Sequence, residues 1–184
     1  MKNKSLIIVG ALLVAIMILA VALYPSLSQK AEESLETTTE VSTTKKPAEN
    51  LKKYTDITIY DKDRNEIKLS DFEGKPMIIN FWATWCGYCL HEMPDFEAAF
   101  KEHGDEIQFL IINTDDGIAK GEKYLTENGY TLPSCYDLKY NAYKTYNLSS
   151  LPRTIAIDAD GNIRYNRAGM IDAAKLQSII DMIK

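Results

Sequence analysis

The sequence is poor in the residues from which proteins build structural metal sites. Its 184 residues include only three cysteines and two histidines. A structural zinc site takes four protein ligands, commonly supplied by two closely spaced pairs. Cys86 and Cys89 form one such pair, but His91, His103 and Cys135 supply no matching second pair. We therefore expect no structural zinc, no other metal and no cofactor.

Positive charge is also in short supply. The formal net charge is -5 and the sequence pI is near 5.1. The acidity belongs to the main body of the chain, because residues 54–184 contain 14 lysines and arginines against 21 aspartates and glutamates. Proteins that bind nucleic acid concentrate basic residues on one surface. A nucleic-acid partner is therefore not expected.

Charge is missing altogether from one long segment near the N-terminus. Leu6 to Tyr24 contains no charged residue, whereas Lys2 and Lys4 precede it. About nineteen residues at ~1.5 Å each span about 28 Å, close to the ~30 Å hydrocarbon core of a bilayer. Residues 1–24 are therefore predicted to be a signal anchor, since the apolar core of a cleaved signal peptide is usually only ~7–15 residues long.

A cleaved signal peptide, and hence a secreted protein, is the alternative. Ala20-Val21-Ala22 fits the small-x-small pattern that precedes a cleavage site. In both cases the two lysines stay on the cytoplasmic side and the rest of the chain is exported. Residues 25–52 follow as a polar, threonine- and glutamate-rich linker, and residues 53–184 as the folded domain. Such a small tethered domain does not demand an oligomer, so we expect a monomer.

From residue 53 onward, strand and helix patterns alternate, which predicts an α/β fold. One hairpin is expected over Ile57–Leu69 with its turn at residues 63–65, and another around Asp160-Gly161. "PMIINFWAT" and "IQFLIINTD" are continuous apolar runs, typical of strands buried on both faces. Helices are expected over residues 86–103, 118–128, 138–146 and 171–184, with a short strand near Cys135. One central mixed sheet with helices on both sides fits this order best.

A dithiol at the start of a helix indicates redox chemistry. Cys86 is expected at the first turn, where unpaired N–H groups and the positive end of the helix dipole favour thiolate over thiol. The pKa of Cys86 should therefore fall below the ~8.5 of a free cysteine. Its exposed thiolate can attack a disulfide, and the shielded Cys89 can then resolve the mixed disulfide. Two unreactive core cysteines, the plain alternative, would not explain why the pair stands between a strand and a helix.

The segment "FWATWCGYC", followed by Glu92 and Pro94 and later by "SLPRT", resembles the thioredoxin superfamily. More narrowly it resembles the membrane-tethered ResA/TlpA-like thiol–disulfide oxidoreductases, over about residues 54–184. The resemblance implies a thioredoxin fold, with a central mixed β-sheet flanked by helices, an extra N-terminal β-hairpin and an inserted strand–helix unit. It also implies an enzyme on the outer face of a bacterial cytoplasmic membrane.

The resemblance assigns roles to the cysteines and to one proline. Cys86 matches the attacking cysteine and Cys89 the resolving cysteine, and together they form the redox disulfide. Pro152 matches the superfamily proline whose preceding peptide bond is cis. In relatives, the backbone of the residue before this proline, here Leu151, pairs with the client chain.

Three further side chains are expected around the client. Trp82 and Trp85 should form packing and docking surface around the motif, and Tyr88 is expected to contact the client. Tyr88 stands where relatives often have a proline, so the direction of the redox reaction cannot be inherited from them. Arg153 stands where threonine is common, and a cation there would favour the thiolate and attract an acidic client.

Glu92 is expected to move a proton. It lies three residues after Cys89, on the same face of the expected helix. Thioredoxins carry a buried aspartate in the strand before the motif, but here that position is Asn80, which cannot take up a proton. In the ResA-like group a glutamate at the position of Glu92 is the carboxylate near the dithiol. Half-buried there, it should have a raised pKa, suited to accepting and returning the proton of Cys89. A solvated surface glutamate is the alternative.

The resemblance implies that the enzyme reduces disulfides in exported client proteins, with electrons from a membrane thiol transporter. Clients are expected in cytochrome c maturation or in the repair of oxidised exported proteins. A thiol oxidase that forms disulfides is the nearest alternative. A copper-delivery protein normally has wider cysteine spacing and a distal histidine, and a thiol peroxidase needs a lone peroxidatic cysteine. Cys135 is expected to be a small buried hydrophobe, and His91 and His103 to be solvated.

Overall fold

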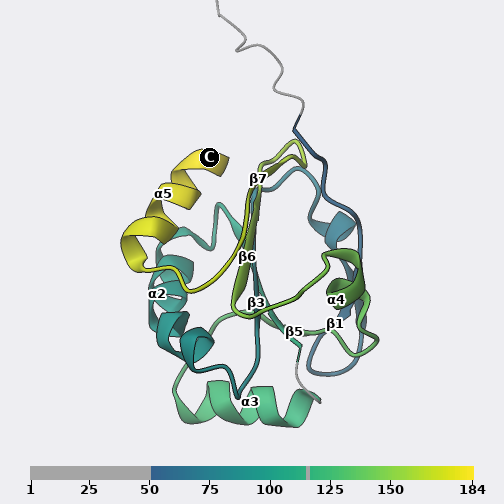
Figure 1. Ribbon diagram of the computed structural model, residues 1–184, viewed down its shortest axis with the longest axis vertical. Helices are drawn as coiled ribbons and strands as arrows, with labels where there is room; N and C mark the ends of the chain where they lie inside the picture. The colour runs from purple at the N-terminus through teal and green to yellow at the C-terminus, as the bar shows by residue number, and fades with distance from the viewer. Residues whose placement is uncertain (1–50, 115–116) are drawn as a thin grey trace, which may run out of the picture. The chain divides into compact units, whose positions relative to one another are not determined.

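The computed structural model describes residues 51–114 and 117–184 (Figure 1). The predicted signal anchor, residues 1–24, and the predicted linker up to residue 50 lie outside the described residues. Both described ranges belong to a single unit, Ala48–Lys184. Among the helices of the described ranges, none is long and apolar enough to cross a membrane.

A seven-stranded mixed sheet forms the centre of the described unit, in the order β2-β1-β5-β4-β3-β6-β7. The strands are β1 (Thr58–Tyr60), β2 (Glu66–Lys68), β3 (Met77–Trp82), β4 (Gln108–Asn113), β5 (Ser134–Tyr136), β6 (Arg153–Ile157) and β7 (Ile163–Ala168). The helices are η1 (Leu69–Phe72), α2 (Gly87–His103), α3 (Ile118–Glu127), α4 (Asn141–Thr145) and α5 (Ala173–Ile183). β3 pairs in parallel with β4 and antiparallel with β6, so the sheet is mixed, as predicted.

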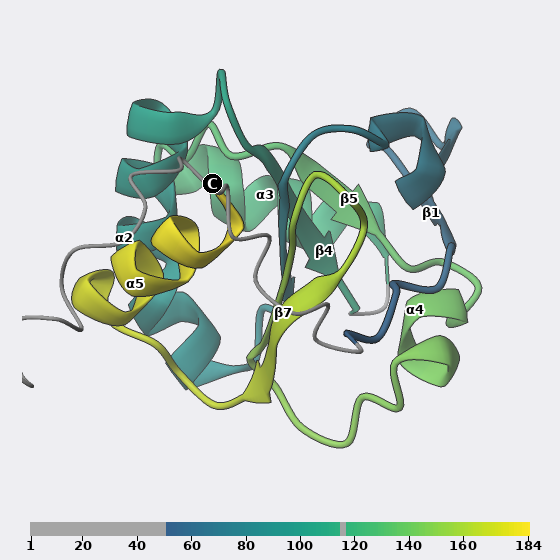
Figure 2. The ribbon, with the colours of Figure 1, turned by 90° about the horizontal axis from the view of Figure 1, so that it is seen from above.

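The two faces of β3 bury different clusters of side chains. The odd-numbered residues from Met77 to Phe81 face η1 and α4, whereas Ile78 and Trp82 face α2, α3 and α5. Figures 1 and 2 show α2 and α5 side by side on one face of the sheet and α4 on the other. All six residues of β3 are buried, because both faces are covered. Asn80 lies two residues from Ile78 and two from Trp82, so its side chain is directed to the same face of the sheet, the one that carries α2.

The first predicted hairpin is present, with its turn where the sequence placed it. β1 and β2 pair antiparallel. Oδ1 of Asp61 accepts hydrogen bonds from the backbone N–H groups of Asp63 and Asn65, each at 2.8 Å. Arg64 between them has a left-handed backbone with φ of 68°. The aspartate side chain thus closes the turn that a local sequence of polar residues predicts.

One predicted helix is shorter than expected. Residues 138–146 were expected to be helical, but α4 spans only Asn141–Thr145. Tyr140 at its N-cap has φ of 57°, a left-handed conformation that a right-handed helix cannot include. Oδ2 of Asp137 accepts the N–H of Tyr143 at 2.8 Å, which holds the chain in a turn before α4.

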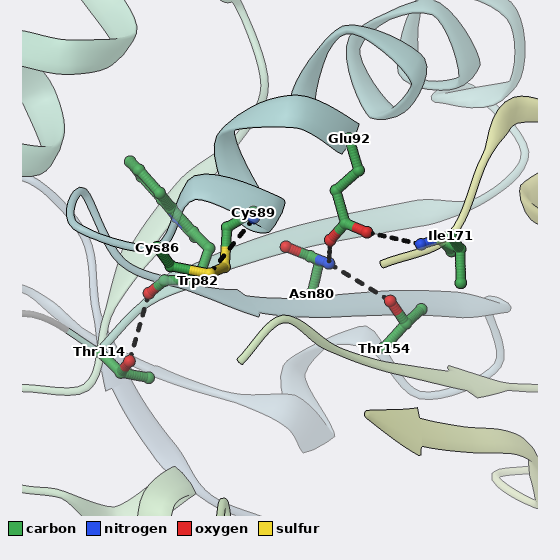
Figure 3. The surroundings of a disulfide bond; sticks show 8 residues. All are labelled: Asn80, Trp82, Cys86, Cys89, Glu92, Thr114, Thr154 and Ile171. Atoms are coloured by element: carbon green, nitrogen blue, oxygen red, sulfur yellow. Dashed lines mark hydrogen bonds between the residues drawn. A yellow bond between two sulfur atoms is a disulfide. The ribbon is translucent and has the colours of Figure 1, made fainter. Parts of the chain in front are cut away.

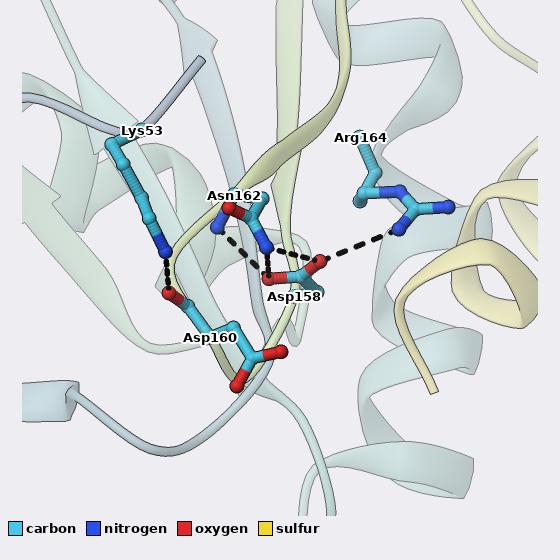
Figure 4. A network of polar contacts seen from close by, with 5 residues as sticks. All are labelled: Lys53, Asp158, Asp160, Asn162 and Arg164. Atoms are coloured by element: carbon cyan, nitrogen blue, oxygen red, sulfur yellow. Dashed lines mark hydrogen bonds and ion pairs between the residues drawn. The ribbon is translucent and has the colours of Figure 1, made fainter. Parts of the chain in front are cut away.

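The described chain enters the sheet at the turn between β6 and β7. The N–H of Ile163 donates to the carbonyl of Lys52 at 2.9 Å. The ammonium of Lys53 donates to the carbonyl oxygen of Asp160 in the turn (Figure 4). These contacts fix the first described residues to one end of the sheet.

A second set of polar contacts holds the same turn. The N–H of Asn162 donates to Oδ1 of Asp158 at 2.8 Å, and Arg164 lies 3.5 Å from the other carboxylate oxygen (Figure 4). In the register of β3 and β6, Met77 pairs with Ile157 at this end. β3 therefore begins next to the turn and runs away from it, toward the end of the sheet that carries the cysteines.

Candidate active site

The predicted dithiol lies where β3 ends and α2 begins. Cys86 is the N-cap residue of α2, with an extended backbone of φ -88° and ψ 97°. The N–H of Cys89 donates to Sγ of Cys86 at 3.2 Å. The two cysteines are joined in a disulfide with 5.3 Å between their Cα atoms (Figure 3). The positive end of α2 thus faces Sγ of Cys86, which would stabilise a thiolate there.

The cysteine pair is more deeply placed than predicted. Cys89 is fully buried, as expected, but Cys86 is only 6% exposed in the disulfide, whereas the sequence predicted an exposed attacking sulfur. Trp82 is buried on the same face of the sheet, and its ring centroid lies 5.7 Å from that of Tyr124. The expected packing and docking roles of the two tryptophans are therefore divided, since Trp82 packs in the core and Trp85 is exposed.

Two exposed aromatic side chains adjoin the pair. Trp85 is 72% exposed and Tyr88 is 70% exposed, as a docking surface requires. Tyr88 also lines a surface pocket of about 440 Å³ together with Gly87, His91 and Met170. Met170 comes from the loop before α5. Nothing in the sequence marks Met170, because only the tertiary fold brings it to the first turn of α2.

Glu92 is fully buried, at 1% exposure, so the prediction of a half-buried side chain is wrong and the carboxyl is not a solvated one. Oε1 accepts a hydrogen bond from Nδ2 of Asn80 at 2.8 Å, and Oε2 accepts one from the N–H of Ile171 at 2.9 Å. Burial raises the pKa of Glu92 to about 7, against the two hydrogen bonds, which lower it, and with a small further rise from Asp95. In Figure 3 the carboxylate and the disulfide lie on the same side of α2.

Asn80 and Thr154 complete this polar cluster. Nδ2 of Asn80 also donates to Oγ1 of Thr154, at 3.3 Å, and the two residues pair in the register of β3 and β6. Asn80 is 1% exposed and Thr154 is fully buried. From the sequence, Asn80 is noted only as a residue that cannot take up a proton, and Thr154 carries no role. A polar residue in the middle of an apolar strand is the signal that points to such a cluster.

The proline segment lies at the same end of the sheet. The Leu151–Pro152 peptide bond is cis, as the resemblance implied. Arg153 begins β6 and pairs with Phe81, near the end of β3 that leads to the cysteines. The guanidinium Nε of Arg153 donates to Oδ1 of Asn166 on β7 at 2.8 Å. This hydrogen bond holds the Arg153 guanidinium along the sheet, so its positive charge stays at the edge of the site.

The remaining candidates lie apart from the dithiol or carry no chemistry there. Cys135 is buried in the cluster on the other face of the sheet, and burial raises its pKa to about 12, so the prediction of a small buried residue is confirmed. His91 is exposed, as expected, but His103 is half-buried, with Nε2 3.4 Å from Oε1 of Gln177. Within residues 51–114 and 117–184, no group of three or more His, Cys, Asp or Glu side chains is arranged to hold a metal ion.

Known proteins are similar to this chain in both sequence and fold. The model of the AhpC/TSA family matches residues 51–166. The thiol-disulfide oxidoreductase ResA of Geobacillus kaustophilus is 31% identical over 132 residues, which cover 70% of this chain and 75% of that protein. This chain belongs to the AhpC/TSA family and is a ResA-type thiol–disulfide oxidoreductase.

Two solved structures support the assignment of this ResA-type oxidoreductase. A candidate thiol-disulfide oxidoreductase from Bacteroides vulgatus is 31% identical with a TM-score of 0.65, covering 74% of this chain and all of that one. The exposed lipoprotein thioredoxin Etrx1 of Streptococcus pneumoniae is 28% identical with a TM-score of 0.60, covering 69% of this chain and 99% of that one. The thioredoxin-like fold predicted for this ResA-type enzyme is thereby confirmed.

Proposed function

We propose that this ResA-type oxidoreductase reduces disulfides of exported proteins through Cys86 and Cys89, on the outer face of a bacterial cytoplasmic membrane. The observation that carries the proposal is the unequal placing of the two sulfurs. Cys86 caps α2 and its sulfur accepts the N–H of Cys89, whereas Cys89 is buried one turn further along the helix. Negative charge is therefore stabilised on Cys86 first, which is what ordered exchange requires.

The exchange takes two balanced steps. The thiolate of Cys86 attacks one client sulfur, forms a Cys86–client disulfide and releases the other client sulfur as a thiolate. Cys89, once deprotonated, attacks Sγ of Cys86, which re-forms the Cys86–Cys89 disulfide and releases the second client thiolate. Two electrons pass from the pair to the client, and an external dithiol then reduces the pair again.

Glu92 takes up the proton of Cys89 as that thiol attacks and returns it when the pair is reduced again. Because burial raises its pKa to about 7, the carboxyl can accept or donate a proton near neutral pH. It stands one turn after Cys89 on α2, on the side of the helix that carries the disulfide (Figure 3). The client itself would contact Trp85 and Tyr88, which are both exposed beside the pair.

The segment around the cis proline supplies the other side of the client surface. The backbone at Leu151 would pair with the client chain, and Pro152 would pack against the bound sulfur, since both belong to the segment that begins β6 at this end of the sheet. Arg153 would attract acidic side chains of the client to the rim of the site.

The family and the N-terminal sequence support the proposed location and partners. Residues 1–24 would anchor the chain in the cytoplasmic membrane, and residues 25–52 would link this anchor to the domain at 53–184. The solved relative from Streptococcus pneumoniae is described as an exposed lipoprotein, which supports an extracytoplasmic place. A membrane thiol transporter would supply the electrons, and the clients would be proteins of cytochrome c maturation or oxidised exported enzymes under repair.

A trapping experiment tests the order of the two sulfurs. The Cys89→Ser variant should accumulate a mixed disulfide with a disulfide-bearing client through Cys86, because the second step is blocked. The Cys86→Ser variant, the matched control, should accumulate none. Equal trapping by both variants would mean that the sulfurs are equivalent and that the ordered mechanism is wrong.

A redox titration against glutathione tests the direction. Potentials of such dithiols run from about -270 mV in reductases to about -120 mV in strong oxidants. We expect the Cys86–Cys89 pair near the reducing end of that range. A value near the oxidising end would replace the proposed reductase by a thiol oxidase that forms disulfides in its clients.

A further inference from the structure

Asn80 lies between the redox disulfide and Glu92 (Figure 3). In this view its amide nitrogen is turned to Glu92 and its amide oxygen to the side of the disulfide. We propose that Asn80, held by Thr154, is a positioning residue that orients the Glu92 carboxyl for proton exchange with Cys89 and satisfies that carboxyl both with and without its proton. This inference rests on the proposed function and deepens it.

The contacts commit both N–H groups of the Asn80 amide. Nδ2 donates to Oε1 of Glu92 at 2.8 Å and to Oγ1 of Thr154 at 3.3 Å. The three residues are at most 1% exposed, so water has little access to them. An amide offers two donors on its nitrogen and an acceptor on its oxygen, and a threonine hydroxyl can either accept or donate. The arrangement in the structure suits an ionised Glu92, which can only accept.

The same three residues can also serve the protonated carboxyl. A half-turn of the Asn80 amide exchanges its oxygen and nitrogen, so that the oxygen accepts the new O–H of Glu92. The hydroxyl of Thr154 then rotates and donates to the same amide oxygen. The N–H of Ile171 remains on Oε2 in both states, which leaves Oε1 as the oxygen that carries the proton. The Glu92 carboxyl therefore keeps a partner on both oxygens in either protonation state, while the amide nitrogen of Asn80 turns from Glu92 to the side of the disulfide.

Charged neighbours do not stabilise the ionised Glu92 carboxylate in place of Asn80. From α2, Asp95 adds to the rise that burial causes in the pKa of Glu92, and from β7 the phenol of Tyr165 lies close enough to be affected by the charges of Glu92 and Arg167. Burial raises the pKa of Tyr165, Arg167 lowers it and Glu92 raises it, with a net rise. Neither Asp95 nor a neutral phenol can neutralise a carboxylate.

The loop before α5 supplies no counter-charge either. Asp172 follows the amide of Ile171 directly, but its Oδ1 accepts the N–H of Lys175 at 2.8 Å and so caps α5. Among the residues that the structure describes, no cation forms an ion pair with Glu92. Asn80 is therefore the partner whose amide must turn when Glu92 gains or loses its proton.

The test measures the titration of the Glu92 carboxyl by ¹³C NMR in the oxidised protein, where the cysteines do not titrate. The wild-type midpoint should lie at about 7. Asn80→Leu keeps the size of the side chain but removes the donor, so the midpoint should rise by about one pH unit, the size of one lost hydrogen bond to a charge. Thr154→Val leaves one amide N–H unpaired in the charged state and should raise the midpoint by roughly half a unit.

Two threonine variants are the controls. Thr154→Ser retains the hydroxyl and should leave the midpoint unchanged. Thr114→Val removes a hydroxyl that donates to the carbonyl of Trp82 at 3.2 Å, near the disulfide but without contact to Glu92, and should also leave it unchanged (Figure 3). Thr154→Val, the milder change, keeps the test open if Asn80→Leu does not fold.

Kinetics supply a second measurement that a merely structural role would not affect. The pH profile of the step in which Cys89 releases the client should move with the Glu92 midpoint in Asn80→Leu and Thr154→Val. The alkylation rate of Cys86 in the reduced protein should not change. A folded Asn80→Leu or Thr154→Val variant with a wild-type midpoint, or an equal shift in Thr114→Val, would overturn the inference. Loss of ordered exchange in the wild type would instead remove the proposed function and leave the titration result standing.

Discussion

Replacing Glu92 with glutamine should remove one pH dependence from the stability of the oxidised protein. Burial raises the pKa of Glu92 from 4.5 to about 7 in the folded state. Because the folded protein holds this proton more tightly than the unfolded chain does, the group contributes stability that is complete below pH 4.5 and lost as the pH rises through 7. A difference of about 2.5 pH units corresponds to about 3 kcal/mol.

Urea denaturation of the wild type and of Glu92→Gln, from acid to pH above 8, measures this contribution. The difference between the two free energies of unfolding cancels the titration of other groups. That difference should fall by about 3 kcal/mol over the window between pH 4.5 and 7, with a slope no steeper than about 1.4 kcal/mol per pH unit. Glutamine retains the size of the side chain, and the amide of Asn80 can turn to match it.

Glu102→Gln is the matched control, because this glutamate is on the same helix with its side chain 73% exposed. Its difference curve should not show the fall of about 3 kcal/mol that is expected for Glu92→Gln. A flat curve for Glu92→Gln, or one that rises with pH, would refute the claim that burial outweighs the two hydrogen bonds to the carboxylate. A rising curve would mean that the folded state prefers the charged form.

Three other substitutions and one labelling experiment test the fold and the edge of the site. Glu97→Ala should lower the unfolding free energy by about 2–3 kcal/mol in urea, because its buried carboxylate accepts the N–H and the hydroxyl of Thr131, at 2.9 and 2.6 Å. Lys101→Ala should lower the unfolding free energy by less than about 0.5 kcal/mol, because the side chain of Lys101 is 62% exposed. Equal losses in the Glu97 and Lys101 variants would contradict this account. Iodoacetamide should label Cys135 only in denaturant, since burial raises its pKa to about 12, and labelling of the native protein would speak against that burial. Arg153→Thr should slow exchange with an acidic client peptide several-fold at low salt and not at about 1 M salt, whereas equal slowing with a basic peptide would exclude an electrostatic role.

Local sequence patterns were sufficient for the parts of the fold that depend on local forces. The hairpin turn at Asp61 is closed by contacts within four residues, and the sequence marks it with polar residues between apolar runs. β3 could be predicted because a strand covered on both faces is apolar throughout. The start of α2 at Gly87, directly after Cys86, could be predicted because the apolar strand gives way there to residues at helical spacing.

The depth of the site could not be predicted in this way. Helical spacing shows which face of α2 carries Glu92, but its burial depends on the loop before α5, whose Ile171 amide reaches the carboxylate from 79 residues away. Thr154 reaches Asn80 from a strand that is 74 residues further along. Such contacts depend on how the sheet and the loops assemble. The periodicity of apolar residues within one segment does not predict them.

The first described residues and the reactive sulfurs lie at opposite ends of the sheet. Lys52 is hydrogen-bonded at the turn beside the start of β3, and Cys86 comes shortly after the end of β3. The six residues of β3, at ~3.3 Å each, separate these two ends of the sheet by about 20 Å. A client bound at Cys86 would therefore lie at the opposite end of β3 from the point at which the described chain enters the sheet.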